Sequence, residues 1–314
     1  MSDTAELSRT TSRDCGLPEP FAGWFRSRGW TPRPHQIELA TLAARGESAL
    51  LIAPTGAGKT LAGFLPSLVE LSTGRARSRR SARDVPVRAG PHTLYVSPLK
   101  ALAVDIARNL ERPIAEMNLP VTVETRTGDT PQNRRQRQRI APPDILLTTP
   151  EQVALLLSHT DADRYFADLR VVILDELHAL VTSKRGDLLS LGLARLRRHA
   201  PGLRTVGLSA TVADPDGLRA WLVAQPPPPA EPARAALVTV PAGARPEISI
   251  LESRERVPWA GHMTRHALPE IYEAIKAART TLVFVNTRSQ AEVLFHELWR
   301  INEDTLPIAL HHGS

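Results

Sequence analysis

Ala53-Pro54-Thr55-Gly56-Ala57-Gly58-Lys59-Thr60 is the stretch of sequence that decides the fold. The apolar run from Leu50 to Ile52 precedes it and predicts a strand that leads into a loop. Gly56 and Gly58 allow positive φ, so the backbone of this loop can turn its N–H groups toward an anion. A helix that begins near Lys59 would direct the positive end of its dipole at the same anion.

Two side chains of this stretch predict that the anion is a nucleotide phosphate. Lys59 can carry a positive charge to the β- and γ-phosphates, and the hydroxyl of Thr60 can bind Mg²⁺. A glycine-rich turn before an ordinary helix is the alternative interpretation. We favour a P-loop because the strand, the loop, the Lys-Thr pair and the helix all agree.

A second stretch, Val171 to Glu176, ends in a pair of carboxylates. Its four aliphatic residues are typical of a central parallel strand that is buried on both faces. Ligands of such sheets bind beyond the carboxyl ends of the strands, where Asp175 and Glu176 fall. Asp175 can hold Mg²⁺, and Glu176 can orient and deprotonate an attacking water. A surface turn is the alternative, but the upstream P-loop favours a site that hydrolyses a nucleoside triphosphate.

Length and composition exclude several classes of protein. A chain of 314 residues allows about two domains. No apolar run approaches the roughly 20 residues that a membrane span needs, and Met1 to Pro20 contains no hydrophobic signal region. The single cysteine, Cys15, excludes an internal disulfide and a cysteine-rich zinc site. We therefore expect a cytoplasmic protein.

The net charge of +6 gives modest support to a polyanionic partner. Only four of the 39 basic residues are lysines, and arginine is abundant along the whole chain, so compositional bias is an alternative cause of the charge. The segment Gln132 to Ile140 is predicted to be a very basic helix. Its arginines (Arg134, Arg135, Arg137 and Arg139) suit either an electrostatic grip on a polyanion or a solvated helix face.

Strand and helix patterns alternate along the chain and predict a doubly wound parallel α/β sheet. Besides the two strands above, we expect strands over Thr93–Ser97, Val121–Thr125, Asp144–Thr149 and Thr205–Leu208. We expect the intervening helices after Pro98, over Glu151–Ser158 and over Leu188–His199.

The same patterns predict four regions. Residues 1–20 are expected to be disordered, and residues 21–224 to form the first domain. The proline run within 225–235 cannot join a core, so it is placed as a linker. Residues 236–314 would then begin a second α/β domain, with strands over Thr281–Asn286 and Leu306–His311 around a helix over Ser289–Arg300. The arginine-rich stretch 75–88 is predicted to be a mobile loop.

Together these motifs resemble the ATP-binding core of superfamily 2 helicases of the DEXH-box group. The chain looks most like the large helicase-related (Lhr) family, in its ligase-associated DNA-repair branch. Ala53 stands where the usual P-loop has glycine, as it often does in this superfamily. The segments that carry the resemblance are Trp30–Gln36, Ala53–Thr60, Ser97–Leu102, Thr127–Asp129, Thr148–Glu151, Asp175–His178, Ser209–Thr211 and Val283–Glu292.

The resemblance implies a RecA-like fold followed by the start of a second RecA-like lobe. It also implies an ATP–Mg²⁺ site with Lys59, Asp175, Glu176 and His178 in catalysis. Gln36 would read adenine, since a carboxamide can pair with N6 and N7 together; an ordinary glutamine at a helix start is the alternative. Ser209 and Thr211 would couple hydrolysis to movement near His178. The remaining nucleotide contacts would come from Pro54, Thr55, Gly56, Ala57, Gly58 and Thr60.

A set of residues between the two nucleotide motifs would hold the phosphate backbone of a nucleic-acid strand, according to the resemblance. These residues offer a charge, hydroxyls and helix starts, which position a strand without reading its sequence. Taken singly, they are ordinary turn and cap residues. The set is Lys100, Thr127, Gly128, Thr149 and Pro150.

The expected function is therefore an ATP-dependent helicase, with single-stranded or partly duplex DNA as partner. Polarity of 3′ to 5′, a role in DNA repair and a DNA-ligase partner follow from the resemblance alone. An RNA helicase, or a module that binds ATP and nucleic acid without turnover, is the alternative. The sequence also predicts the N-terminal part of a longer protein, because the arginine fingers of such helicases would follow His311-His312-Gly313-Ser314. A metal site at the two histidines is disfavoured.

Overall fold

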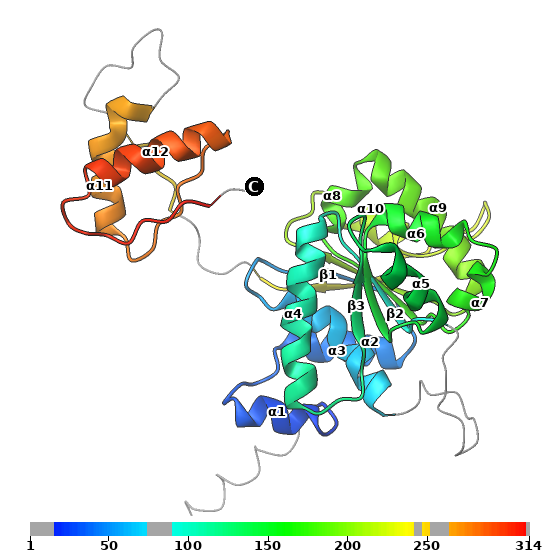
Figure 1. The fold of residues 1–314 in the computed structure, drawn as a ribbon. Coiled ribbons are helices and arrows are strands. Elements are labelled where there is room, and N and C mark those ends of the chain that lie inside the picture. The colour runs from blue at the N-terminus through cyan, green and yellow to red at the C-terminus, as the bar shows by residue number, and fades with distance from the viewer. Residues whose placement is uncertain (1–15, 74–89, 242–246, 252–263, 312–314) are drawn as a thin grey trace, which may run out of the picture. The chain divides into compact units, whose positions relative to one another are not determined.

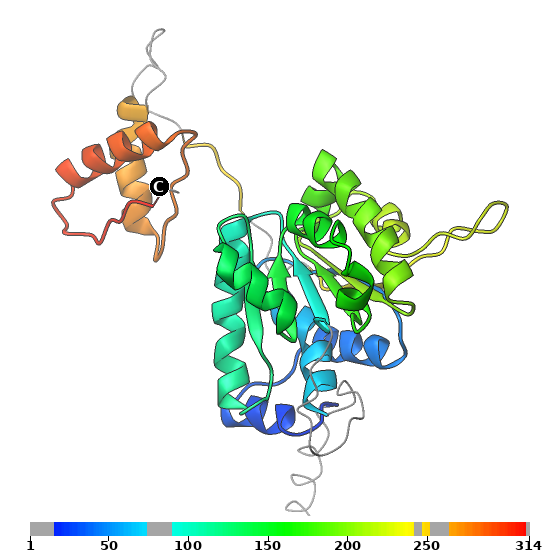
Figure 2. The same cartoon turned by 45° about the vertical axis from the view of Figure 1, so that its right-hand side comes forward.

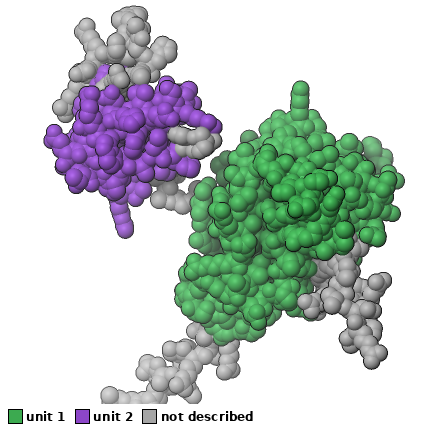
Figure 3. Space-filling model, in the orientation of Figure 1, with its two compact units in different colours: residues 1–243 green, residues 244–314 purple. Residues whose placement is uncertain are grey.

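The computed structural model describes residues 16–73, 90–241, 247–251 and 264–311, and it divides into two compact units (Figures 1 and 3). The first unit runs to Gly243 and the second begins at Ala244. Most of the segment predicted to be disordered (1–15 of residues 1–20) and the whole arginine-rich stretch 75–88 lie outside the described residues.

The first unit is built on a parallel sheet with strand order β3-β4-β2-β5-β6-β1-β7. Later strands pair on both sides of β1 and on both sides of β2, which makes the sheet doubly wound. The predicted fold class is therefore confirmed. The strands are β1 (Ala49–Ile52), β2 (Thr93–Val96), β3 (Val123–Arg126), β4 (Ile145–Thr148), β5 (Val171–Leu174), β6 (Arg204–Ser209) and β7 (Ala236–Thr239).

Helices cover both faces of this sheet (Figures 1 and 2). One apolar cluster contains residues of α1 (Phe21–Ser27), α2 (Pro34–Ala44), α3 (Lys59–Ser72) and α4 (Lys100–Glu116). The other contains residues of α6 (Pro150–Leu157), α7 (Ala162–Phe166), α8 (Leu177–Val181), α9 (Lys184–His199) and α10 (Pro215–Trp221). The predicted basic helix is α5 (Gln132–Ile140).

The central strands supply both clusters because successive side chains of a strand point to opposite faces. In β5, Val171 and Ile173 join the cluster with α1–α4, and Val172 and Leu174 join the other. Every residue of β5 is buried, which explains its unbroken aliphatic sequence. The carboxylates that follow are therefore held by a rigid strand.

The predicted linker at 225–235 is wrong in its position. After the proline run the chain returns to the sheet as β7, which pairs in parallel with β1 from Ala49↔Ala236 to Ile52↔Thr239. The backbone N–H of Ala236 also donates to the carbonyl of Ser48. The prolines therefore lie in a loop within the first unit, and the division between units falls after Gly243. β7 is an edge strand of only four residues. Its sequence pattern is too short to be recognised directly after a proline-rich loop.

The second unit packs two helices, α11 (Leu268–Ala277) and α12 (Arg288–Arg300), after a 3₁₀ turn, η1 (Thr264–Ala267). Its small core contains Leu268, Tyr272 and Leu298. The strands predicted over Thr281–Asn286 and Leu306–His311 are wrong, because no strand is formed among the described residues of this unit. A parallel strand needs a neighbour, and without one Leu282 and Phe284 remain exposed.

Candidate functional site

The carboxyl edge of the sheet is divided between the two groups of predicted site residues. The P-loop follows β1 and the carboxylates follow β5, and Ser209 ends β6, which lies between these two strands. The predicted strand-holding residues follow β2, β4 and β3, which form the other side of the sheet. Six distant segments are thus brought to one edge, with the β2–β5 pair at the boundary.

The P-loop has the backbone that its glycines predict. Gly56 and Gly58 have φ values of 81° and 75°, and Gly58 is the left-handed cap residue of α3. Lys59 follows directly as the first residue of α3, and its Nζ donates a hydrogen bond of 2.8 Å to the carbonyl of Ala53. This bond closes the loop on itself and holds the ammonium over the loop.

Two residues at the start of α2, to which the motifs assign no role, brace the P-loop. Arg33 donates through Nη1 to the carbonyl of Gly56 at 3.2 Å. His35 is buried, and its Nε2 lies 3.0 Å from the carbonyl oxygen of Ala57. A carbonyl only accepts, so Nε2 carries the proton. Burial lowers the pKa of His35 and keeps the ring neutral. Their position beside Gln36 was the signal that could have pointed to them.

Gln36 has a structural role in the free protein. Its Oε1 accepts a bond of 2.9 Å from the backbone N–H of Arg33, and this bond caps the start of α2. The side chain is buried, unlike a solvated helix-start glutamine. A Cβ built on Gly58 would lie 3.3 Å from its Nε2, so the carboxamide directly adjoins the P-loop.

Asp175 is buried and has two hydrogen-bond donors. One is the backbone N–H of Glu176, at 2.9 Å from Oδ1. The other is the phenol of Tyr95, which donates to Oδ2 from the neighbouring strand β2. Burial, followed by the charge and the hydrogen bond of Asp175, raises the pKa of Tyr95. Sequence reasoning missed Tyr95, because a tyrosine within an apolar strand pattern looks like a core residue.

Glu176 is the N-cap residue of α8, and His178 is the second residue of that helix. Glu176 has a left-handed backbone, with φ of 47°, and its carboxylate oxygen lies 3.6 Å from Nδ1 of His178. Nδ1 of His178 is also 2.8 Å from the hydroxyl of Ser209, at the end of β6. Ser209 therefore lies beside His178, as predicted. Thr211 takes part through its carbonyl, which lies 3.2 Å from the Ser209 hydroxyl.

Lys100 and Gly128 adjoin each other on the other half of the edge. Nζ of Lys100 lies 2.9 Å from a carboxylate oxygen of Asp129, and a Cβ on Gly128 would lie 3.2 Å from the same Nζ. The lysine charge is compensated by Asp129 in the free protein. Both side chains are more than half exposed, so the pair is accessible to a competing anion.

Three further predicted residues of this edge are buried: Thr127, Thr149 and Pro150. The hydroxyl of Thr127 accepts from the backbone N–H of Asp129 at 3.3 Å, which shapes the turn after β3. Thr149 is the N-cap residue of α6, and Pro150 is its first residue. Gly128 is exposed, so its backbone is the part of this turn that an external anion can reach.

All four arginines of α5 have partners within the chain. Arg134 and Arg137 contact the carboxylate of Glu124, and Arg139 contacts Asp161. Arg135 donates through Nη2 to the carbonyls of Thr127 and Gly128, at 3.1 and 2.5 Å. This helix therefore holds the turn after β3 in place and is not simply a solvated face.

The residues of the first half fit a magnesium nucleotide. Thr60 and Asp175 offer hydroxyl and carboxylate oxygens, which are the ligands that Mg²⁺ prefers. Gly56 has open space where a Cβ would project, so a phosphate can approach its backbone closely. The fit rests on these oxygens and on the open, left-handed backbone of the P-loop.

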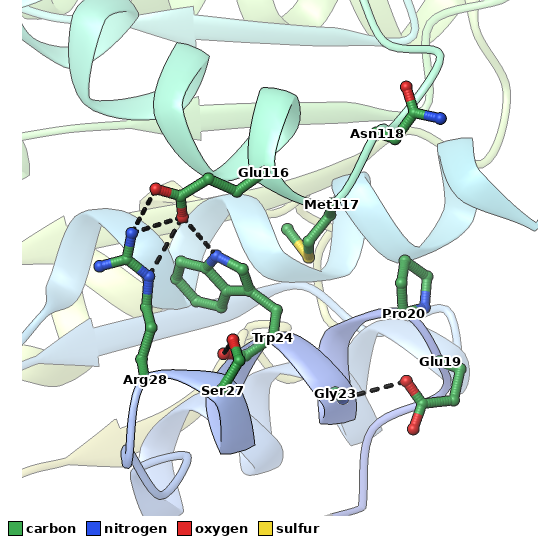
Figure 4. A pocket seen from close by; sticks show the side chains of 9 residues that line it. All are labelled: Glu19, Pro20, Gly23, Trp24, Ser27, Arg28, Glu116, Met117 and Asn118. Atoms are coloured by element: carbon green, nitrogen blue, oxygen red, sulfur yellow. Dashed lines mark hydrogen bonds and ion pairs between the residues drawn. The ribbon is translucent and has the colours of Figure 1, made fainter.

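A cavity of about 570 Å³ lies elsewhere, between α1 and the end of α4 (Figure 4). One of its two carboxylates, Glu116, accepts from Trp24 at 2.8 Å and pairs with Arg28, and these bonds lower the pKa of Glu116 to about 2. Glu116 ends the helix that Lys100 begins, about 24 Å away at 1.5 Å per residue. The cavity is thus separate from the site, and its central charges compensate each other.

These features are those of a P-loop nucleotide-binding fold, and comparison with known proteins specifies it further. The family model described as DEAD/DEAH box helicase matches residues 33–217. The chain is 36% identical over 307 residues to "Lhr helicase/ probable uracil glycosylase" of Mycolicibacterium smegmatis, covering 92% of this chain and 19% of that protein. It is 33% identical over 311 residues to "ATP-dependent helicase Lhr-Core protein 2" of Thermococcus barophilus, covering 95% of this chain and 35% of that protein.

A solved structure agrees with these relatives. The Mycobacterium smegmatis helicase Lhr bound to ssDNA and AMP-PNP superimposes with a TM-score of 0.72 at 33% identity, over 92% of this chain and 36% of that chain. The chain belongs to the DEAD/DEAH box helicase family, and Lhr helicases are among its relatives. It spans between about a fifth and about a third of the length of the relatives named above. Within the described residues, no helix combines the length and apolarity that a membrane span needs.

Proposed function

We propose that this chain forms the ATP-binding lobe of an ATP-dependent DNA helicase, followed by the start of a second lobe. The observation that carries the proposal is the divided carboxyl edge of the sheet. The residues proposed to bind the nucleotide lie at the ends of β1, β6 and β5. The residues proposed to hold the DNA strand follow β2, β3 and β4. Tyr95 of β2 donates a hydrogen bond to Asp175, which follows β5. This bond links the nucleotide half of the edge to the strand-holding half.

Each residue of the nucleotide half has a defined task in ATP hydrolysis. Lys59 would exchange its bond to the Ala53 carbonyl for bonds to the terminal phosphates, and Gln36 would recognise adenine beside the P-loop. Thr60 and Asp175 would hold Mg²⁺, which neutralises charge on the phosphates when it is bound. Glu176 would take the proton of the attacking water. Ser209, which is hydrogen-bonded to His178, would couple hydrolysis at the site to movement of β6.

DNA is the partner that the comparisons support. The structure of the Mycobacterium smegmatis relative contains ssDNA, and the similarity covers 92% of this chain and 36% of that one. Lys100 and the exposed turn at Gly128 offer a charge and accessible backbone, which suit phosphates and do not read bases. Polarity of 3′ to 5′, a repair role, the ligase-associated branch and a DNA-ligase partner remain narrower proposals from the family resemblance.

Strand binding can be tested by fluorescence anisotropy with a labelled single-stranded DNA over a range of salt concentrations. We expect weak binding without sequence preference and a linear fall of log affinity with log salt. Lys100→Ala should reduce the salt slope by about 0.7, the value for one phosphate contact on a single strand. Lys276→Ala is the matched control, because Lys276 is also exposed and paired with acidic residues but lies on α11.

Three results would contradict the proposal. Binding that is indifferent to salt would exclude a phosphate grip. Equal effects of the two lysine substitutions would show that only net charge matters. An RNA of the same base sequence, bound much more tightly than the DNA, would favour an RNA helicase instead.

A further inference from the structure

One guanidinium, that of Arg185, connects two segments of the proposed strand-holding half. Its Nε and Nη2 donate to the two carboxylate oxygens of Glu151 at 2.5 and 3.1 Å, and its Nη1 donates to the carbonyl of Pro98 at 2.6 Å. Pro98 lies two residues before Lys100, and Glu151 directly follows Pro150. The segments after β2 and β4 are therefore held by a single planar group.

The chemistry of this contact requires arginine. Three donors in one plane reach three oxygens on two residues, which a lysine ammonium at the end of a flexible chain cannot reproduce. The hydrogen bond from Arg185 is the largest cause that lowers the pKa of Glu151 to about 2. Glu151 is consequently ionised at neutral pH, and the bidentate pair persists over the working range of the protein.

Arg185 is also tied to the nucleotide half through a short path along the chain. It is the second residue of α9, and α8 begins at Leu177, directly after the carboxylates. Gly186 allows α9 to start against α8, because a Cβ there would lie 2.3 Å from the carbonyl of Leu180. The Ser183 hydroxyl accepts from the Gly186 N–H at 3.3 Å and caps the helix. The position of Arg185 is thus fixed by the helices that follow Asp175 and Glu176.

We propose that Arg185 is a positioning residue that sets the spacing between the Lys100 segment and the start of α6, and that ties both to the carboxylate motif. The proposal rests on the nucleic-acid role proposed above. Arg185 acts through its bonds to Glu151 and Pro98 and does not itself contact the strand.

A direct contact of Arg185 with a nucleic-acid phosphate makes opposite predictions. If arginine bound phosphate, Arg185→Lys would retain most of the affinity and Glu151→Gln would tighten binding by removing a negative charge. If arginine positions the segments, Arg185→Lys, Arg185→Ala and Glu151→Gln should each weaken single-stranded DNA binding about five- to tenfold, the effect of about one net hydrogen bond. The salt slope should stay unchanged, because no phosphate contact is lost.

The control is Arg195→Ala, on the same helix. Arg195 donates to the carbonyl of Leu157 at 2.6 Å and so links α9 to the other end of α6. General loosening of the α6–α9 contact should affect both arginine variants, whereas loss of positioning should affect only Arg185. Calorimetry with ATP–Mg²⁺ serves as the second readout, and we expect ATP affinity within about twofold of wild type for all variants.

The outcomes separate this inference from the proposed function. Tighter DNA binding by Glu151→Gln, or wild-type affinity in Arg185→Lys, would overturn the positioning role. Equal losses in Arg195→Ala and Arg185→Ala would also overturn it. If Lys100→Ala weakens binding and the Arg185 and Glu151 variants do not, only this inference fails. If Lys100→Ala has no effect, the proposed strand-holding half fails and this inference fails with it.

Discussion

Tyr95→Phe should destabilise the first unit by a predictable amount, because it removes the donor to a buried carboxylate. The Tyr95 side chain is fully buried and Asp175 is 5% exposed, so water cannot readily replace the lost donor. A hydrogen bond to a charged group contributes about 1.5–3 kcal/mol, and this sets the expected loss. The aromatic ring, which is stacked on Phe64 with centroids 5.2 Å apart, is retained. For a domain of this size, the melting temperature should fall by about 3–12 °C.

Tyr165→Phe is the matched control for this experiment. Tyr165 is also buried, but its hydroxyl has no hydrogen-bond partner among the residues that the structure describes. Removing that hydroxyl should change the free energy of unfolding by less than about 0.5 kcal/mol, or increase it slightly. Urea unfolding followed by circular dichroism measures both variants.

A loss below about 0.5 kcal/mol in Tyr95→Phe would refute the reasoning, because the bond to Asp175 would then add nothing to stability. Equal losses in both variants would refute it as well, since any buried tyrosine hydroxyl would then behave alike.

Four further predictions address the site. Lys59→Ala should weaken ATP binding by more than about tenfold, measured by calorimetry, because the P-loop loses its charge-assisted bond to phosphate; unchanged affinity would exclude the P-loop assignment. In a longer form that carries the complete motor, Glu176→Gln should retain ATP binding and lose turnover, and near wild-type hydrolysis would exclude Glu176 as the base. Asp129→Asn should tighten single-stranded DNA binding, since Lys100 would no longer be neutralised, and weaker binding would contradict that view. Because the pKa of Glu151 falls from an ordinary 4.5 to about 2 on folding, its contribution to stability is complete above about pH 4.5 and is lost as the pH falls through 2; the stability difference between wild type and Glu151→Gln should shrink over that range in acid-unfolding titrations.

Some residues of the site were recognisable from local pattern, and others were not. Gly58 and Lys59 were recognisable because a left-handed backbone before a helix needs glycine. Tyr95 and Arg185 were not, because their partners lie 80 and up to 87 residues away along the chain. No local periodicity reports such pairs, so their roles depend on which strands and helices become neighbours.

The sequence by itself determined the parallel α/β class, the P-loop and the carboxylate strand, since glycine spacing and unbroken aliphatic runs constrain the backbone locally. Only the tertiary structure decided that β7 joins β1, that Gln36 caps α2 beside the P-loop, and that the segment 281–286 forms no strand in the described second unit. These outcomes depend on the neighbour that each segment finds. A strand exists only where another strand supplies hydrogen bonds, and a polar side chain takes the partner that packing places within reach.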